Sequence, residues 1–173
     1  MAQDLSAASW LKKRHNINLR EENELEMVSF LLLWSMFENS ILKNNNTTCN
    51  NIPQRIVKKA SKIRANHKEV LQKIREFYIS HKEPDYIFTK FKFGRTLGDK
   101  VKNYLTTSEP SAADERIVVV AVIYKFRCNF FHGDKNFGDV ANSQIDRFKT
   151  FNRFLIACLD EENGITHTSI KNK

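Results

Sequence analysis

Hydrophobic residues recur along this chain at helical spacing rather than in the two-residue alternation of half-buried strands. The clearest segment, residues 27–37, is apolar nearly all round, which is typical of a buried helix. Acidic residues crowd positions 21–24, where they would suit the positive end of a helix, and an asparagine-rich run follows at 44–48. The pattern therefore predicts a helix over residues 21–43.

The same spacing predicts further helices along the rest of the chain. They are an amphipathic stretch at 53–81 that forms one helix or two, a short helix at 97–105, and longer helices at 112–132 and 139–160. The pattern leaves open whether residues 86–93, which include three phenylalanines, form a helix or an extended loop. We therefore expect an all-α protein, a bundle of about five helices.

Composition supports a single folded domain. The chain has 173 residues, of which 41% are hydrophobic and 13 are Phe, whereas Gly occurs five times and Pro three times. A sheet-rich fold would spend more Gly and Pro on its turns. We expect one domain over residues 1–173, with a loose leader at 1–19 and a mobile tail at 161–173.

Several classes of protein are disfavoured by what the sequence lacks. No apolar run reaches the roughly 18 residues that span a bilayer, and the N-terminus does not read as a signal peptide. The three cysteines, Cys49, Cys128 and Cys158, are widely spaced and form no CxxC pair. We therefore expect a cytoplasmic protein with no membrane contact, no disulfide framework, no metal site and no other cofactor.

Positive charge is concentrated in the middle of the chain. Residues 53–105 carry 14 basic and five acidic side chains, a net charge of +9, whereas the whole chain carries +8. The two flanking segments are therefore close to neutral. A localised basic block is the electrostatic footprint of a polyanion-binding surface, although basic helices without such a partner are also common.

The predicted helix at 112–132 ends in a sequence with distinct chemistry. At 100° per residue, one stripe of this helix holds Val119, Ile123, Phe126 and Phe130 and should face the core. The opposite side displays the polar and small residues, namely Ala121, Lys125, Cys128, Asn129 and His132, with Arg127 at its border. We expect the small residues on this side to permit close approach of a partner helix.

This segment resembles the HEPN (higher eukaryotes and prokaryotes nucleotide-binding) superfamily. Arg127 and His132 enclose four residues, as in the R-X4-6-H motif, and the string FRCNFFHG is similar to the R-N-x-x-F-H-G form of that motif. The upstream string LWSMFE, which ends at Glu38, resembles the apolar, acid-bearing helix that accompanies it. Cys128 stands where such ribonucleases often carry a polar residue.

The resemblance implies a metal-independent endoribonuclease that cleaves RNA by attack of the 2′-hydroxyl. His132 would be the acid and base, Arg127 would bind the phosphate, and Asn129 would orient the phosphate or the imidazole. The resemblance also implies a two-fold homodimer in which the motif-bearing helices face one another. Members of the superfamily recur in toxin–antitoxin and antiphage systems, so an antitoxin or a larger effector protein is a further expected partner.

Other residues have supporting roles in this hypothesis, with alternatives left open. Glu38 would orient Arg127 or His132 from behind, or else be a structural or solvated carboxylate, and Cys128 would lie beside them. Four lysines are expected to contact the RNA backbone, namely Lys58, Lys59, Lys62 and Lys125. The four remaining histidines are expected on the surface, namely His15, His67, His81 and His167. Two rival readings are a non-catalytic helical module that dimerises or docks a partner, and a domain that binds a nucleotide without cleavage.

Overall fold

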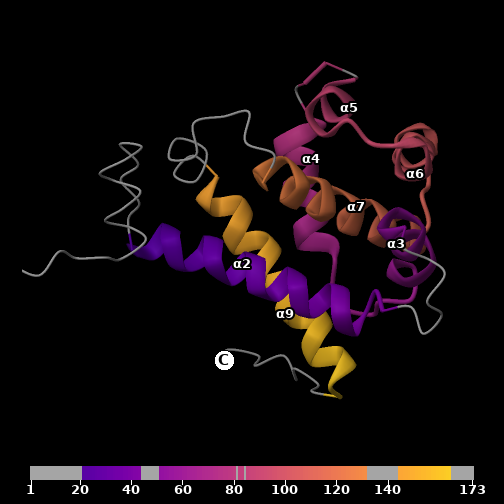
Figure 1. Ribbon diagram of the computed structural model, residues 1–173. Helices are drawn as coiled ribbons and strands as arrows, with labels where there is room; N and C mark the ends of the chain where they lie inside the picture. Colours follow the sequence, from indigo (N-terminus) through magenta and orange to yellow (C-terminus); the bar gives the residue numbers. More distant parts are fainter. Residues whose placement is uncertain (1–20, 44–50, 81, 84, 132–143, 165–173) are drawn as a thin grey trace, which may run out of the picture.

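The computed structural model describes residues 21–43, 51–80, 82–83, 85–131 and 144–164. These residues contain seven α-helices and no strand, which confirms the predicted all-α class (Figure 1). The helices are α2 (Glu21–Ser40), α3 (Ile52–Ala60), α4 (Lys68–Tyr78), α5 (Tyr86–Phe91), α6 (Arg95–Thr106), α7 (Ala112–Phe131) and α9 (Ile145–Glu162). None of these helices is long and apolar enough to cross a membrane.

Helix α7 runs through the middle of the protein, between the α2–α9 pair and the helices α5 and α6 (Figure 1). Its residues 117–123 carry no charge and are all buried. Ser111 starts the helix: its hydroxyl accepts a hydrogen bond from the Asp114 amide at 3.2 Å and donates one to the Asp114 carboxylate at 2.6 Å. The uncharged stretch at the centre of α7 can therefore be surrounded by other helices.

Aromatic rings join α2, α7 and α9 in the core. Phe30 of α2 and Phe148 of α9 both meet Phe126 of α7 edge to face, with ring centroids 5.6 and 5.2 Å away. Phe151 of α9 meets the same Phe126 ring at 5.1 Å. Edge-to-face pairs at these separations add stability beyond the area that they bury. The predicted core stripe of α7, which includes Phe126 and Phe130, is confirmed as buried.

The prediction of about five helices was too low, because the stretch at 53–81, for which the sequence left one helix or two open, forms both α3 and α4, and α5 follows as a further helix. The chain bends at residues 61–67, where its backbone groups are bonded by side chains from distant helices. Arg116 Nη1 donates to the Ser61 carbonyl at 2.9 Å, and the Glu161 carboxylate accepts from the Arg64 amide at 3.0 Å. The segment that the sequence left open at 86–93 forms the short helix α5.

The C-terminal helix begins and ends later along the chain than the predicted 139–160, starting at Ile145. It continues to Glu162, so Glu161 belongs to α9 rather than to a mobile tail, and it is fixed by its hydrogen bonds to Arg64. The predicted leader at 1–19 and the remainder of the tail from 165 lie outside the described residues.

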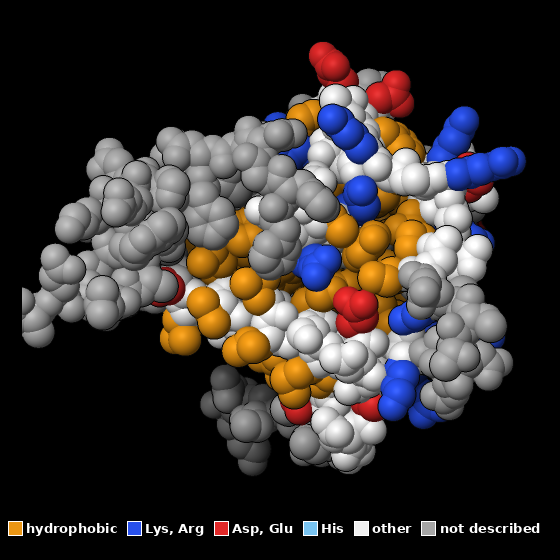
Figure 2. Space-filling model, in the orientation of Figure 1, with side chains coloured by type: hydrophobic (Ala, Val, Ile, Leu, Met, Phe, Trp, Pro, Cys, Tyr) orange, Lys and Arg blue, Asp and Glu red, His pale blue; other side chains and the backbone are white. Residues whose placement is uncertain are grey.

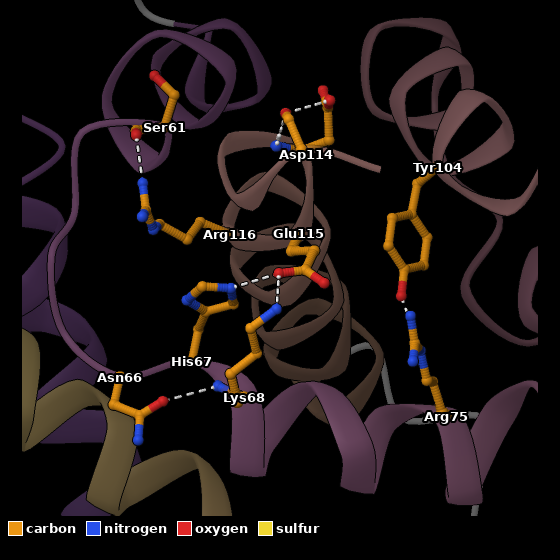
Figure 3. Close-up of polar contacts among 10 residues, drawn as sticks. Ser61, Asn66, His67, Lys68, Arg75, Tyr104, Asp114, Glu115 and Arg116 are labelled. Carbon is orange, nitrogen blue, oxygen red and sulfur yellow. Dashed lines mark hydrogen bonds and ion pairs between the residues drawn. The ribbon is translucent and has the colours of Figure 1, made fainter. Parts of the chain in front are cut away.

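His67 is buried, so its expected place on the surface was wrong. The residue is 6% exposed, and its Nε2 lies 2.8 Å from Glu115 Oε2, which also accepts a 2.6 Å bond from Lys68 Nζ (Figure 3). Burial alone would raise the pKa of Glu115, but the hydrogen bonds from Lys68 and His67 outweigh it and lower that pKa. The ionised carboxylate can only accept, so His67 donates from Nε2. This clamp joins the 61–67 bend to the start of α7.

We predict that Glu115→Gln lowers the free energy of unfolding by about 2 kcal/mol at pH 7, because hydrogen bonds to a charged acceptor become bonds to a neutral one. The stabilisation from ionised Glu115 is present above its ordinary pKa of 4.5 and is lost as the pH falls through the lower pKa of the folded state. Urea unfolding from pH 7 to pH 3 should therefore show a shallower acid decline for the variant. Glu109→Gln, at an exposed position, should retain the wild-type decline, and equal slopes for both variants would contradict the clamp.

Candidate functional site at the end of helix α7

The final turns of α7 are where this helix reaches the surface. Tyr124, Lys125, Arg127 and Cys128 are half-buried and Asn129 is exposed, whereas the intervening Phe126 is buried. Ala121, expected on an open side, is fully buried. At Ala121 this side of α7 is already covered by the protein itself, and in the C-terminal half of the helix it becomes accessible from Tyr124 onward.

Helix α2 supplies the neighbouring wall of this site. The Trp34 ring lies against the Tyr124 ring, with centroids 5.9 Å apart. Trp34 Nε1 also donates a 3.0 Å hydrogen bond to Glu38 Oε2, one turn further along α2. The indole therefore fixes the Glu38 carboxylate on the side of α2 that faces the end of α7.

The pKa of Tyr124 depends on burial and on three neighbouring polar groups. Burial raises its pKa to about 12, with further contributions from the Cys128 thiol and the Glu38 charge, while the Arg127 charge acts in the opposite direction. Four groups from two helices thus share one electrostatic environment. The sequence analysis missed Tyr124, although its spacing of three residues from Arg127 and four from Cys128 places it on their side of the helix.

The Asn129 side chain forms a hydrogen bond with helix α5. Its Nδ2 donates a 2.8 Å hydrogen bond to the carbonyl of Lys90, near the end of α5. The predicted role of Asn129 was to orient the phosphate or the imidazole, and the geometry adds a structural one. This contact ties α5 to the turn of α7 that carries Arg127.

The predicted RNA-contacting lysines do not lie together. Lys125 is on the same turns of α7 as Arg127, whereas Lys58, Lys59 and Lys62 lie on α3 and in the bend that follows. That bend meets α7 at Arg116, which bonds the Ser61 carbonyl. Arg127 is eleven residues further on, about 16 Å along the helix axis. The structure therefore separates the α3 lysines from the candidate site.

His132 follows the last residue of α7 directly and lies outside the described residues. Within the part of the chain that the structure describes, no three His, Cys, Asp or Glu side chains are grouped so that they could hold a metal ion. The site is therefore defined by Arg127, Tyr124 and Cys128 of α7 together with Glu38 of α2.

Comparison with known proteins found no family model that matches this chain. No curated protein and no solved structure matched it either.

We predict that Asn129→Ala lowers the free energy of unfolding by about 1 kcal/mol, because one hydrogen bond between α5 and α7 is lost. Asn129→Asp should cost more, since a carboxylate oxygen would face the Lys90 carbonyl. Urea denaturation would measure both, with Asn39→Ala, at an exposed position on α2, as the control. If Asn129→Ala changed the free energy of unfolding as little as the control, the hydrogen bond between Asn129 and Lys90 would not contribute to stability.

Proposed function

We propose that this protein is a metal-independent endoribonuclease of the HEPN type. The observation that carries the proposal is the grouping of Arg127, Tyr124 and Cys128 with Glu38 at the exposed end of α7, immediately before His132. A half-buried guanidinium at the surface can bind a phosphate in two-pronged geometry. A toxin or antiphage role is part of this proposal and rests on the sequence resemblance.

The proposed chemistry needs one group that moves protons and one that stabilises the phosphate. The 2′-oxygen forms a bond to phosphorus while the bond from phosphorus to the 5′-oxygen breaks; a proton leaves the 2′-hydroxyl and another reaches the departing oxygen. Tyr124, whose pKa is raised to about 12, stays protonated near neutrality and does not act as the base. In the proposed reaction His132 transfers the protons, and Arg127 stabilises the negative charge that develops on the phosphate.

The proposal includes a homodimer, for which α2 offers a surface. Four large apolar side chains form an exposed row on α2, the α2 stripe, at 68%, 42%, 62% and 54% exposure for Leu25, Val28, Leu32 and Met36. Figure 2 shows hydrophobic side chains gathered along this helix. The stripe suits a two-fold contact between identical copies. Trp34, which touches Tyr124, is buried on the opposite side of α2, so a dimer on this stripe would leave each candidate site on the far side of the helix from the interface.

The same stripe favours one alternative, a non-catalytic module that docks a different protein. An antitoxin or a larger effector with an apolar helix would cover Leu32 and its neighbours as well as a second copy would. Under this alternative, Arg127 would pair with a partner's acidic groups and no RNA would be cleaved.

The central prediction is that the wild-type protein cleaves single-stranded RNA or transfer RNA in the presence of EDTA. His132→Ala should reduce the rate by about 10²- to 10⁴-fold through loss of proton transfer, and Arg127→Ala by about 10²- to 10³-fold through loss of phosphate stabilisation. Gel analysis of 5′-labelled RNA would measure both rates. Arg153→Ala is the matched control, because that arginine forms an exposed ion pair on α9, and it should cleave like the wild type.

An inert wild-type preparation, or cleavage that both site variants retain, would refute the ribonuclease proposal. In the first case the docking alternative becomes the working hypothesis. In the second case the activity belongs to another site or to a contaminant.

For the homodimer, we predict that Leu32→Glu converts a dimer into a monomer, because two carboxylates would be buried against each other at the two-fold contact. Light scattering after gel filtration would measure the mass. Asn103→Glu introduces the same charge at an exposed position on α6 and should leave the dimer intact. A monomeric wild type at tens of micromolar would exclude the homodimer and favour a different protein on the α2 stripe.

A further inference from the structure

A pocket of about 590 Å³ opens between α5 and the last turns of α6, away from the α2 stripe. It is lined by Asp85, Phe88, Lys102, Leu105 and Thr106, and we call it the α5–α6 pocket. This volume is within the range of about 300–1,000 Å³ that is usual for small-ligand sites. Among these five residues, Lys102 belongs to the basic block at 53–105, and no individual role was predicted from the sequence for any of them.

The lining combines an aromatic surface with groups of opposite charge. Phe88 and Leu105 are half-buried and supply the apolar part, while Lys102 and Asp85 are exposed and supply a cation and an anion. The Phe88 ring is backed edge to face by Phe93, with centroids 6.1 Å apart, which limits how far the ring can turn. A ligand that fits has a flat apolar body, a hydrogen-bond donor and a negative group.

Asp85 is unusual for its place in the fold. It stands at the N-cap of α5, where an aspartate normally bonds the first backbone amides, yet its side chain makes no capping hydrogen bond. The carboxylate is therefore left to accept a donor from a ligand. The Thr106 hydroxyl donates to the backbone carbonyls of Lys102 and Asn103, so toward a ligand its oxygen also acts as an acceptor.

The pocket is physically linked to the candidate site. Helix α5 contacts α7, and the Lys90 carbonyl of α5 holds Asn129, two residues beyond Arg127. Further cations surround α5: Lys82 lies over the Tyr86 ring at 5.3 Å, and Lys92 follows the helix. Aromatic rings among cations are the usual surface for an unpaired nucleic-acid strand.

We propose that the α5–α6 pocket binds one unpaired, amino-bearing nucleotide of a single-stranded RNA, with its base on Phe88, its exocyclic amino group at Asp85 and its phosphate at Lys102. This inference rests on the proposed function for its substrate class. It also assigns strand binding to α5 and α6 in place of the lysines on α3. Cytosine presents an amino group where uracil presents a carbonyl, so the carboxylate of Asp85 favours cytosine.

The test measures binding rather than cleavage. Fluorescence anisotropy would follow labelled 12-residue oligocytidine and oligouridine strands with 2′-O-methyl sugars, which the proposed reaction cannot cut. The wild type should bind oligocytidine about tenfold more tightly than oligouridine, because one base donor meets a charged acceptor. Asp85→Asn, which can both accept and donate, should reduce this preference toward one.

Two further variants test the ring and the cation. Phe88→Leu keeps the apolar packing but removes the stacking surface, and should weaken binding of both strands by about fivefold to 150-fold. Lys102→Gln should flatten the salt dependence of binding by about 0.7 in the logarithmic slope, as expected for one phosphate contact. Lys100→Gln removes the same charge from α6 outside the pocket and should change that slope less.

The outcomes separate this inference from the ribonuclease proposal. Phe88→Leu and Asp85→Asn proteins that remain folded by circular dichroism and bind both strands like the wild type would overturn the pocket. Such a result, combined with loss of binding in Lys58→Gln and Lys62→Gln, would show that the RNA strand binds at the lysines of α3 and the bend after it. Binding that depends on Phe88 in a protein that cleaves nothing would support the pocket and refute the nuclease. Equal affinity for cytidine monophosphate and for the strands would identify a free nucleotide as the ligand and would contradict the proposal that the pocket binds single-stranded RNA.

Discussion

Burial of the uncharged stretch at residues 117–123 of α7 is the packing constraint on which the rest of this structure depends. All six other described helices contact α7, four of them directly alongside it and α2 and α9 through aromatic rings. Each buried valine or isoleucine contributes about 1.5–3 kcal/mol, against a net stability of about 5–15 kcal/mol for a typical domain. Polar chemistry is consequently confined to the two ends of α7. The His67–Glu115 clamp occupies the first end, and the Arg127 group occupies the second.

Periodicity was a sufficient guide to the long helices, because α2, α6 and α7 each carry their apolar residues in local patterns. It failed at the 61–67 bend, since the side chains that bond this bend, Arg116 and Glu161, are 55 and 97 residues from their partners. It also failed for His67, whose burial depends on a carboxylate from another helix. Bonds of this range leave no trace in a local pattern, so a fold built on them requires the tertiary structure.

The candidate site was predicted in part for the same reason. Arg127 and Cys128 share a face with Tyr124 by helical spacing alone, although only the first two were singled out from the sequence. The contribution of Trp34 and Glu38 depends on how α2 lies against α7, which only the structure shows. The basic block illustrates the limit of counting charge. Its residues are near one another in sequence, yet α3, α4, α5 and α6 carry them to different parts of the surface, and α5 is bonded to the end of α7 through Asn129.

The α2 stripe and the α5–α6 pocket are exposed surfaces that suit different kinds of partner. The α2 stripe offers a protein partner an apolar surface on the side of α2 opposite the buried Trp34, while the α5–α6 pocket offers acceptors and a cation to a flexible polyanion. Within the described residues, the final turns of α7 contact both elements, because Tyr124 packs on Trp34 of α2 and Asn129 donates to Lys90 of α5. A partner that shifted α2 would therefore disturb the Trp34–Tyr124 contact together with the core to which Trp34 belongs, whereas a strand on α5 would act on the same turns of α7 through Asn129. The end of α7 is the place where protein binding and strand binding can influence each other.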